Sequence, residues 1–322
     1  MTRTASTPLI APTQSADAPA RSAARALLET TKPGITRLVT MTAGVGFVLA
    51  ASGRSWAIPE LVVTGSACLA GTALSAAGAN SLNQWMERSR DARMDRTRKR
   101  PIPSGDLSPR AVAAAGAVLC VAGLAVLLAG CGLVPMLVSL ACIVSYLAFY
   151  TPMKPATTLA TFVGAIPGAL PPMIGSAAAS TLAGWDALRE PAGLALFCLM
   201  FVWQVPHFLA LAWLYRDDYA KGGYAVLPVV DPKGDSTAWT VALWSAALIP
   251  ATLLPAVVMP DLLGWPYVVV AGLSGAAFFA VAVRLVRSRA RARARAVFLA
   301  SIMHLPALLV AMTAESLLRA AA

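Results

Sequence analysis

Nine apolar segments, each near the ~20 residues that an α-helix needs to cross a bilayer, dominate the sequence and constrain its fold most. They span residues 35–53, 59–79, 111–129, 133–150, 157–178, 192–214, 238–259, 264–283 and 297–314. Only 13% of the 322 residues are charged, against roughly 25% in soluble domains. The sequence therefore predicts an all-α polytopic membrane protein of about nine transmembrane helices.

Lysines and arginines are unevenly distributed between the two predicted faces of the membrane. If the N-terminus lies inside, all but Arg54, Arg189 and Arg319 fall in the inner tail and loops. This asymmetry is the positive-inside pattern, so we expect the N-terminus and the acid-rich loops in the cytoplasm. The net charge of +11 then reflects membrane topology, and we expect no nucleic-acid partner. The expected location is the bacterial inner membrane, with the mitochondrial inner membrane as the alternative.

The first residues differ in composition from the rest of the chain. Residues 1–30 are rich in Ala, Ser, Thr and Pro, and they contain no apolar core long enough for a secretory signal. We interpret them as a disordered tail that precedes a membrane domain at residues 31–316. A mitochondrial transit peptide is the alternative interpretation of this tail.

A densely charged stretch, residues 83–101, directly follows the second apolar segment. Its oxygen-bearing side chains recur every four residues, at Asn83, Glu87, Asp91 and Asp95. If the stretch is helical up to Pro101, these side chains lie along one face. Carboxylates at that spacing repel unless a cation lies between them, and oxygen ligands suit Mg²⁺.

The other faces of this stretch are basic. They carry Arg88, Arg90, Arg93, Arg96, Arg98, Lys99 and Arg100. A diphosphate chelated by a metal requires carboxylates that bind the metal and, beside them, basic side chains that bind the anion. The alternative is a solvated helix held together by its own ion pairs, such as Asp95 with Lys99.

A second acidic pair follows the sixth apolar segment. Asp217 and Asp218 lie between the bases Arg216 and Lys221, so an apolar helix again delivers paired carboxylates to the inner face. We expect the two clusters to face each other across a helical cavity.

The interior of the predicted bundle contains breaks and ionisable groups. The fifth segment holds Gly164, Pro167, Gly168, Pro171, Pro172 and Gly175, so its helix must be kinked or broken. Such a backbone is tolerated at membrane depth where it lines a cavity or packs against protein. The two histidines, His207 and His304, lie within apolar segments, which makes them functional candidates or satisfied core residues.

Two carboxylate clusters flanked by bases in a helical bundle resemble the sites of UbiA-type intramembrane prenyltransferases. Within that family, motifs from about residue 29 to 310 resemble the heme O synthase group. They are Thr31-Lys32-Pro33, Met94-Asp95-Arg96-Thr97, Arg100-Pro101, Tyr150-Thr151-Pro152, residues 164–172, Trp203-Gln204-Val205-Pro206-His207-Phe208, Tyr215-Arg216-Asp217-Asp218-Tyr219 and Leu227-Pro228-Val229. The chain departs from the group at Met153-Lys154-Pro155 and Ser176, and from the wider family at Glu87, where Asp is more usual.

The resemblance implies a UbiA-like bundle with a central cavity in the lipid bilayer. It implies an enzyme that transfers farnesyl from farnesyl diphosphate to a vinyl group of heme B, with heme A synthase or a terminal oxidase as partner. The catalytic candidates it implies are Asn83, Glu87, Asp91, Asp95, Asp217 and Asp218, all except Asp95 also as Mg²⁺ ligands. The implied diphosphate-binding residues are Arg96, Arg100, Lys154, Arg216 and Lys221. His207 and His304 are the candidate heme-binding residues, because neutral imidazole is a common axial ligand of heme iron, although His304 could instead hydrogen-bond a neighbouring helix.

Two other functions remain open from the sequence. A UbiA-type enzyme can prenylate a quinone precursor or a chlorophyllide instead of heme. A membrane transporter also uses broken helices and polar groups, although it would place charge deep within the bundle.

Overall fold

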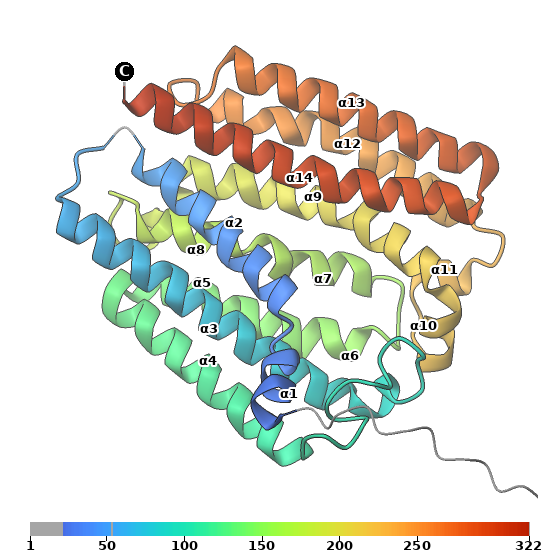
Figure 1. Ribbon diagram of the computed structural model, residues 1–322. Coiled ribbons are helices and arrows are strands. Elements are labelled where there is room, and N and C mark those ends of the chain that lie inside the picture. The colour runs from blue at the N-terminus through green and yellow to red at the C-terminus, as the bar shows by residue number, and fades with distance from the viewer. Residues whose placement is uncertain (1–21, 53, 322) are drawn as a thin grey trace, which may run out of the picture.

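The predicted apolar segments correspond to helices that lie side by side in one bundle (Figure 1). The structure is a computed structural model that describes residues 22–52 and 54–321, and within those ranges it contains no β-strand. The bundle consists of α2 (Pro33–Ala51), α3 (Ile58–Asp91), α4 (Pro109–Cys131), α5 (Leu133–Val144) continued by the π-helix η1 (Ser145–Tyr150) and α6 (Thr151–Met153), α7 (Ala160–Ala169), α8 (Pro171–Ala178), α9 (Pro191–Leu214), α12 (Asp235–Val258), α13 (Trp265–Ser288) and α14 (Arg291–Ala320). Shorter helices are α1 (Ala23–Thr30), the 3₁₀-helix η2 (Gly184–Arg189), α10 (Arg216–Gly222) and α11 (Leu227–Val230).

Within the described residues, eight helical spans are long and apolar enough to cross a membrane. The remaining crossing is the fifth predicted segment, which the structure divides between α7 and α8. The prediction of an all-α membrane protein with about nine crossings is therefore confirmed.

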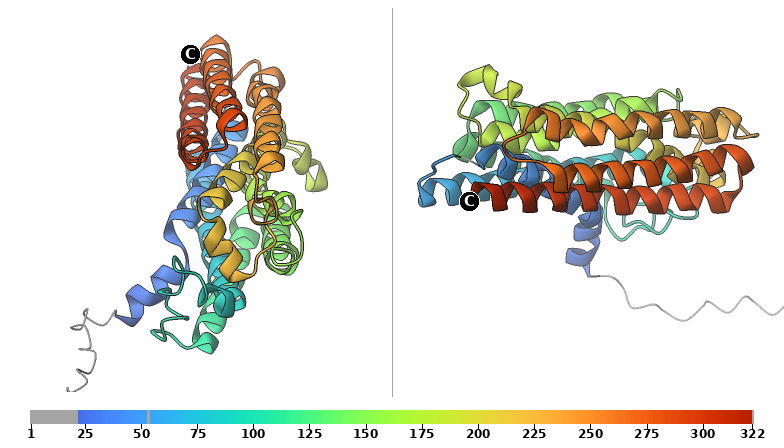
Figure 2. Two further views of the ribbon diagram at one scale, coloured as in Figure 1. Left: turned by 90° about the vertical axis from the view of Figure 1, so that its right-hand side faces the viewer. Right: turned by 90° about the horizontal axis from the view of Figure 1, so that it is seen from above.

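Charged segments gather at one end of the bundle. The last turn of α3, the loop 92–108 and α10 lie there, while the C-terminus lies at the opposite end (Figure 1). We call the first of these the charged end. Figure 2 shows α12, α13 and α14 packed next to one another, and α1 projecting from the side of the bundle.

The packing of α3 against α4 depends on small residues. A side-chain carbon at Gly78 would lie 2.6 Å from the carbonyl oxygen of Gly116, and one at Gly123 would lie 2.5 Å from the backbone nitrogen of Ser75. Glycine at these positions lets the two backbones touch, as is common where helices associate in lipid. This close contact fixes the position of α3, which carries the first acidic cluster.

Residues 23–30 fold, which corrects the prediction of a disordered tail for that part of the chain. Ser22 caps α1 by accepting a hydrogen bond from the backbone of Arg25, and the helix buries Ala26 and Thr30. The Gln84 side chain on α3 donates to the carbonyl of Thr30 at 3.1 Å. The contacts of α1 with α3 stabilise this helix, although the polar composition of the segment predicted disorder. Residues 1–21 lie outside the described residues.

Helix α3 ends at Asp91, ten residues before the proline that was expected to end it. The Thr97 hydroxyl donates to the Asp91 carbonyl at 2.9 Å, and the turn between them buries Met94 to 2% exposure. The helix is therefore ended by a side-chain hydrogen bond and a buried apolar residue, and not by a glycine or proline. As a result, Asp95 does not continue the face formed by Asn83, Glu87 and Asp91.

The predicted break in the fifth segment lies between α7 and α8. Pro171 has no backbone N–H, so the carbonyl of Pro167 loses its helical partner. The Cys142 thiol on α5 reaches that carbonyl at 3.0 Å. The carbonyl freed by the break thus has a hydrogen-bond partner on a neighbouring helix, as a non-helical backbone within a membrane requires.

Replacing Gly175 by alanine should destabilise the bundle. A side-chain carbon there would lie 1.8 Å from the carbonyl oxygen of Ala43, so α8 and α2 must separate, at a cost of roughly 1–3 kcal/mol. Thermal unfolding in detergent should show a melting temperature several degrees lower. The matched control is Gly272→Ala on α13, where nothing lies within 4 Å of the new carbon. Equal melting temperatures for the two variants would contradict this packing.

Candidate active site

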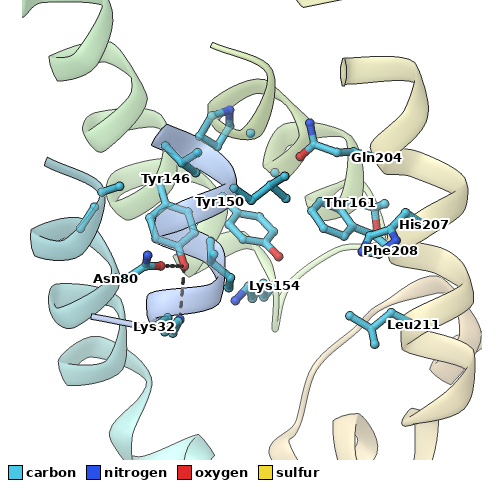
Figure 3. A pocket seen from close by; sticks show the side chains of 18 of the residues that line it. Lys32, Asn80, Tyr146, Tyr150, Lys154, Thr161, Gln204, His207, Phe208 and Leu211 are labelled. Atoms are coloured by element: carbon cyan, nitrogen blue, oxygen red, sulfur yellow. Dashed lines mark hydrogen bonds between the residues drawn. The ribbon is translucent and has the colours of Figure 1, made fainter. Parts of the chain in front are cut away.

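A cavity of about 440 Å³ lies between α2, α3, α5, α7 and α9. Figure 3 shows Lys32 and Tyr146 on one wall, with His207 and Leu211 of α9 on the facing wall. Most of the lining is apolar. Its charged lining residues are Lys32, Glu87, Asp91, Arg96, Arg100 and Lys154.

Asn83, Glu87 and Asp91 lie on successive turns of α3 and are all buried, as the four-residue spacing predicted for one helix face. Each accepts a hydrogen bond from a base that comes from another part of the chain. The contacts are Lys32 Nζ to Asn83 Oδ1 at 2.6 Å, Lys154 Nζ to Glu87 Oε1 at 2.7 Å and Arg100 Nη1 to Asp91 Oδ2 at 2.7 Å. The structure therefore brings three predicted oxygen ligands and three bases together.

Lys154 lies between an acid and two aromatic rings. Its Nζ is 4.5 Å from the ring centroid of Tyr150 and 5.8 Å from that of Tyr224. Burial acts to lower the pKa of Lys154, but the Glu87 carboxylate and the neighbouring tyrosines outweigh it and raise that pKa well above its usual value. Lys154 therefore stays charged at neutral pH and neutralises Glu87.

Asp91 retains an unused acceptor. Within the described residues, its Oδ1 atom is buried without a hydrogen-bond partner, while Oδ2 contacts Arg100. An unpartnered carboxylate oxygen in a buried site is costly, which favours a cation ligand at this position.

The donor set at the charged end fits Mg²⁺. Among the described residues, no three His, Cys, Asp or Glu side chains gather closely enough to hold a metal by themselves. Mg²⁺ usually keeps several waters and binds one or two carboxylates plus substrate phosphates. Glu87 and Asp91 line the cavity and suit that mode of binding. The Asn83 amide oxygen lies one turn earlier on α3, buried behind the cavity lining against Lys32.

Lys32 is a site residue that was not predicted from the sequence, although it belongs to the Thr31-Lys32-Pro33 motif. Its backbone is in the left-handed region, with φ of 48°, directly before α2. Such strain is concentrated at functional sites. Burial and the neighbouring Arg100 charge lower the pKa of Lys32 to about 7.

The π-helix η1 supplies aromatic residues that periodicity did not predict. It places Tyr146 and Tyr150 in the cavity lining, with ring centroids 5.8 Å apart in a stacked arrangement. Tyr146 Oη lies 3.4 Å from Lys32 Nζ, and Thr151 accepts from the amide of Asn83 at 3.0 Å. π-Helical turns often occur at functional sites. The only sequence signal was the Tyr150-Thr151-Pro152 motif.

The loops at the charged end contact each other directly. Asp218 on α10 accepts from the backbone N–H groups of Asp95 and Arg96, both at 3.1 Å. Lys221 pairs with Asp95 at 2.5 Å, and this contact lowers the pKa of Asp95 and raises that of Lys221. The predicted second cluster thus meets the first through Asp218, although Asp95, Asp218 and Lys221 lie outside the cavity lining.

Asp217 and Arg216 lie away from the cavity. The Asp217 side chain is 93% exposed and its Oδ1 is 3.7 Å from Arg216 Nε. Both residues line a separate surface hollow with Pro228. Because α9 ends at Leu214 and α10 starts a new helix, adjacent acids point to different sides of it.

The two histidines occupy different environments. His207 lines the cavity and contacts the Ser301 hydroxyl of α14 through Nδ1 at 2.7 Å. His304 is 3% exposed and packs against Phe278 of α13, with ring centroids 5.6 Å apart. His304 is not among the residues that line the cavity.

A family model described as the UbiA prenyltransferase family matches residues 38–305. The chain therefore belongs to the UbiA prenyltransferase family and is a transferase enzyme of the membrane, as its motifs predicted.

The similar chains point to one group within that family. The chain is 40% identical to a protoheme IX farnesyltransferase of Solibacter usitatus (strain Ellin6076), over 88% of this chain and 95% of the relative. It is 39% identical to a protoheme IX farnesyltransferase of Anaeromyxobacter sp. (strain Fw109-5), over 90% and 93% of the two chains. The predicted resemblance to the heme O synthase group is thereby confirmed.

Solved structures share the fold at low sequence identity. A digeranylgeranylglyceryl phosphate synthase superposes with a TM-score of 0.71 and 14% identity, covering 91% of this chain and 98% of that chain. A UbiA homolog from Archaeoglobus fulgidus, solved with GPP and Mg²⁺, gives a TM-score of 0.57 and 16% identity, covering 89% and 98%. The predicted UbiA-like bundle is therefore confirmed.

Proposed function

We propose that this protein transfers the farnesyl group of farnesyl diphosphate to a vinyl carbon of heme B, which gives heme O. The polarity of the cavity carries the proposal, because bases and buried oxygens meet at one end while most of the lining is apolar. The charged end suits a diphosphate, and the apolar part suits a prenyl chain and a porphyrin. The names of the similar farnesyltransferases support the choice of both substrates.

The diphosphate would bind the bases Lys32, Arg100 and Lys154. In the structure these bases donate to the side-chain oxygens of α3, so a bound diphosphate would replace those oxygens as the acceptors. Phosphate oxygens would take over the bases, and the oxygens of α3 would become free for Mg²⁺. When bound, Mg²⁺ neutralises negative charge on the diphosphate and makes it a better leaving group.

Asn83, Glu87 and Asp91 would hold the metal in this proposal. The Archaeoglobus fulgidus homolog, which was solved with Mg²⁺ and GPP, supports a metal-dependent diphosphate site in this fold. Asp218 would act by fixing the backbone of Arg96, whose side chain lines the cavity. We assign Asp217 no role in the site, because its side chain is exposed and lines a separate surface hollow.

The residues of the cavity would promote ionisation of the diphosphate ester. The bases stabilise the charge that develops on the leaving oxygen as the C–O bond breaks. The apolar walls exclude water from the allylic cation, and the rings of Tyr146 and Tyr150 offer their faces to positive charge.

The vinyl group of heme would then complete the transfer. Its π electrons form the new C–C bond to the farnesyl cation, which leaves a positive charge on the carbon next to the porphyrin ring. That charge is removed by loss of a proton or by capture of one water molecule. The product therefore gains one farnesyl group, with or without the elements of water.

We place the heme beside His207, on the wall of the cavity that faces Lys32 (Figure 3). A neutral imidazole is a common axial ligand of heme iron. His304 does not line the cavity, and we therefore assign it no contact with heme. The charged end would face the cytoplasm, as the distribution of basic residues predicts, and heme O would pass to heme A synthase or a terminal oxidase.

The substrate assignment can be tested with purified protein. Heme B and Mg²⁺ should give a prenylated heme with farnesyl diphosphate, and much less product with geranyl or geranylgeranyl diphosphate. Conversion of a quinone precursor with no conversion of heme would contradict the proposal and favour another activity of the same family.

Binding of the diphosphate should be linked to protonation of Lys32. Because the pKa of Lys32 is about 7 in the free protein, the side chain is largely neutral at higher pH. A bound anion raises that pKa, so at about pH 8.5 binding should take up nearly one proton and affinity should fall as pH rises above about 7. Calorimetry with farnesyl diphosphate and Mg²⁺ in buffers of different ionisation enthalpy measures this uptake.

The control variant is Lys32→Met, which keeps the length of the side chain without its charge. It should lose the proton uptake above neutral pH. The same uptake in wild type and Lys32→Met would contradict the assignment to Lys32.

A further inference from the structure

Ser301 contacts the cavity histidine from a neighbouring helix. It lies on α14, is fully buried, and its Oγ is 2.7 Å from Nδ1 of His207 on α9. The same Oγ lies 2.6 Å from the carbonyl oxygen of Phe298, one turn earlier on α14. Among the described residues, His207 is the only histidine that lines the cavity.

These two contacts determine which nitrogen of His207 carries the proton. A carbonyl oxygen only accepts, so the single hydroxyl hydrogen of Ser301 is donated to Phe298. The Ser301 oxygen must then accept from the ring, which places a hydrogen on Nδ1 of neutral His207. Nε2 consequently carries the free lone pair of the ring, and it is the nitrogen of His207 that remains for a ligand in the cavity.

Aromatic rings hold the imidazole in this orientation. Trp203 stacks on His207 with ring centroids 4.7 Å apart and an interplanar angle of 18°, and Phe298 stacks at 5.2 Å and 27°. The Trp203 indole donates to the backbone carbonyl of Ser301 at 2.9 Å. The ring is therefore fixed by stacking, while the Ser301 hydroxyl sets its tautomer.

We propose that Ser301 is a positioning residue, which holds His207 with Nδ1 protonated so that Nε2 binds the iron of the heme substrate. The inference rests on the proposed function, because it needs heme in the cavity. Iron-binding histidines usually donate their second nitrogen to a fixed acceptor, which orients the ring and increases its basicity. Ser301 supplies that acceptor from a residue that makes no contact with heme itself.

The test compares heme-loaded wild type with Ser301→Ala, Ser301→Thr and His207→Ala. Loss of an acceptor of this kind typically weakens metal binding about 10–100-fold, so Ser301→Ala should bind heme that much more weakly. Its Soret band and its iron–histidine stretch in the reduced state should also shift. Ser301→Thr keeps the hydroxyl and should restore both spectrum and affinity.

The matched control is Ser316→Ala, on the same helix. Ser316 is also fully buried and its hydroxyl also donates to a carbonyl three residues earlier, that of Thr313 at 3.0 Å. It should behave as wild type. Binding of farnesyl diphosphate, measured by calorimetry, should be unchanged in the serine variants and shows that their fold is intact, and the melting temperature serves as the check of the fold for His207→Ala.

Two results would overturn the proposal. In the first, Ser301→Ala matches wild type in spectrum and affinity while His207→Ala loses both, so the serine has no positioning role. In the second, His207→Ala also matches wild type, so His207 does not bind iron. In either case wild type would still convert heme B with farnesyl diphosphate, whereas failure of the proposed function would abolish that conversion.

Discussion

Asp91→Asn should lower turnover at least about 100-fold, as loss of a main electrostatic contact in the transition state does. Asp91 is 1% exposed, and one of its oxygens has no partner among the described residues. The substitution keeps the shape of the side chain but removes the charge that would hold Mg²⁺. Initial rates with saturating heme B and farnesyl diphosphate measure the effect.

The matched control is Asp235→Asn. Asp235 lies in the first turn of α12, its side chain is 49% exposed, and it pairs with Arg289 rather than with a residue of the cavity. Turnover should stay near wild type in this variant. Heme affinity should be unchanged in Asp91→Asn, because the proposed heme site lies on the facing wall. Wild-type turnover in Asp91→Asn would contradict a catalytic role for the carboxylates of α3.

Removal of divalent metal should stop turnover altogether. With excess EDTA the rate should fall to background, and added Mg²⁺ should restore it, because the leaving diphosphate then regains its counter-charge. Chelation should leave the melting temperature unchanged. The reason is that Lys154 pairs with Glu87 and Arg100 pairs with Asp91, so both carboxylates keep a counter-charge when the metal is removed.

This combination separates a catalytic metal from a structural one. A structural metal site would lose stability on chelation, since metal binding contributes directly to folding there. Full turnover in EDTA would contradict the proposed role of Mg²⁺.

The sequence predicted the parts of the site that follow from local periodicity. The spacing of Asn83, Glu87 and Asp91 was sufficient to place them on one face of α3, and the prolines of the fifth segment predicted its break. Both features depend on residues within a few turns of one another.

Contacts between distant segments could not be predicted in the same way. Lys32 reaches Asn83 across 51 positions of the chain, and Lys154 reaches Glu87 across 67. Periodicity within one segment carries no information about such partners. The motif resemblance included Lys32 without indicating that its side chain enters the cavity.

Changes in helix geometry account for the remaining differences. The end of α3 at Asp91 depends on a cap from Thr97 and on burial of Met94, and no proline or glycine marks this position in the sequence. Likewise, the start of a new helix after Tyr215 turns Asp217 outward and Asp218 toward the loop of the first cluster. Side chains at adjacent positions of a helix point in different directions, which the sequence spacing of the two acids did not reveal.

Farnesyl transfer to heme B is most directly tested by the mass of heme extracted from cells that express the protein. Wild type should yield a heme heavier than heme B by one farnesyl group, alone or with one water, and Asp91→Asn should yield almost none. Unmodified heme B as the sole product in the wild-type extract, with the protein folded in the membrane and farnesyl diphosphate present, would contradict the account.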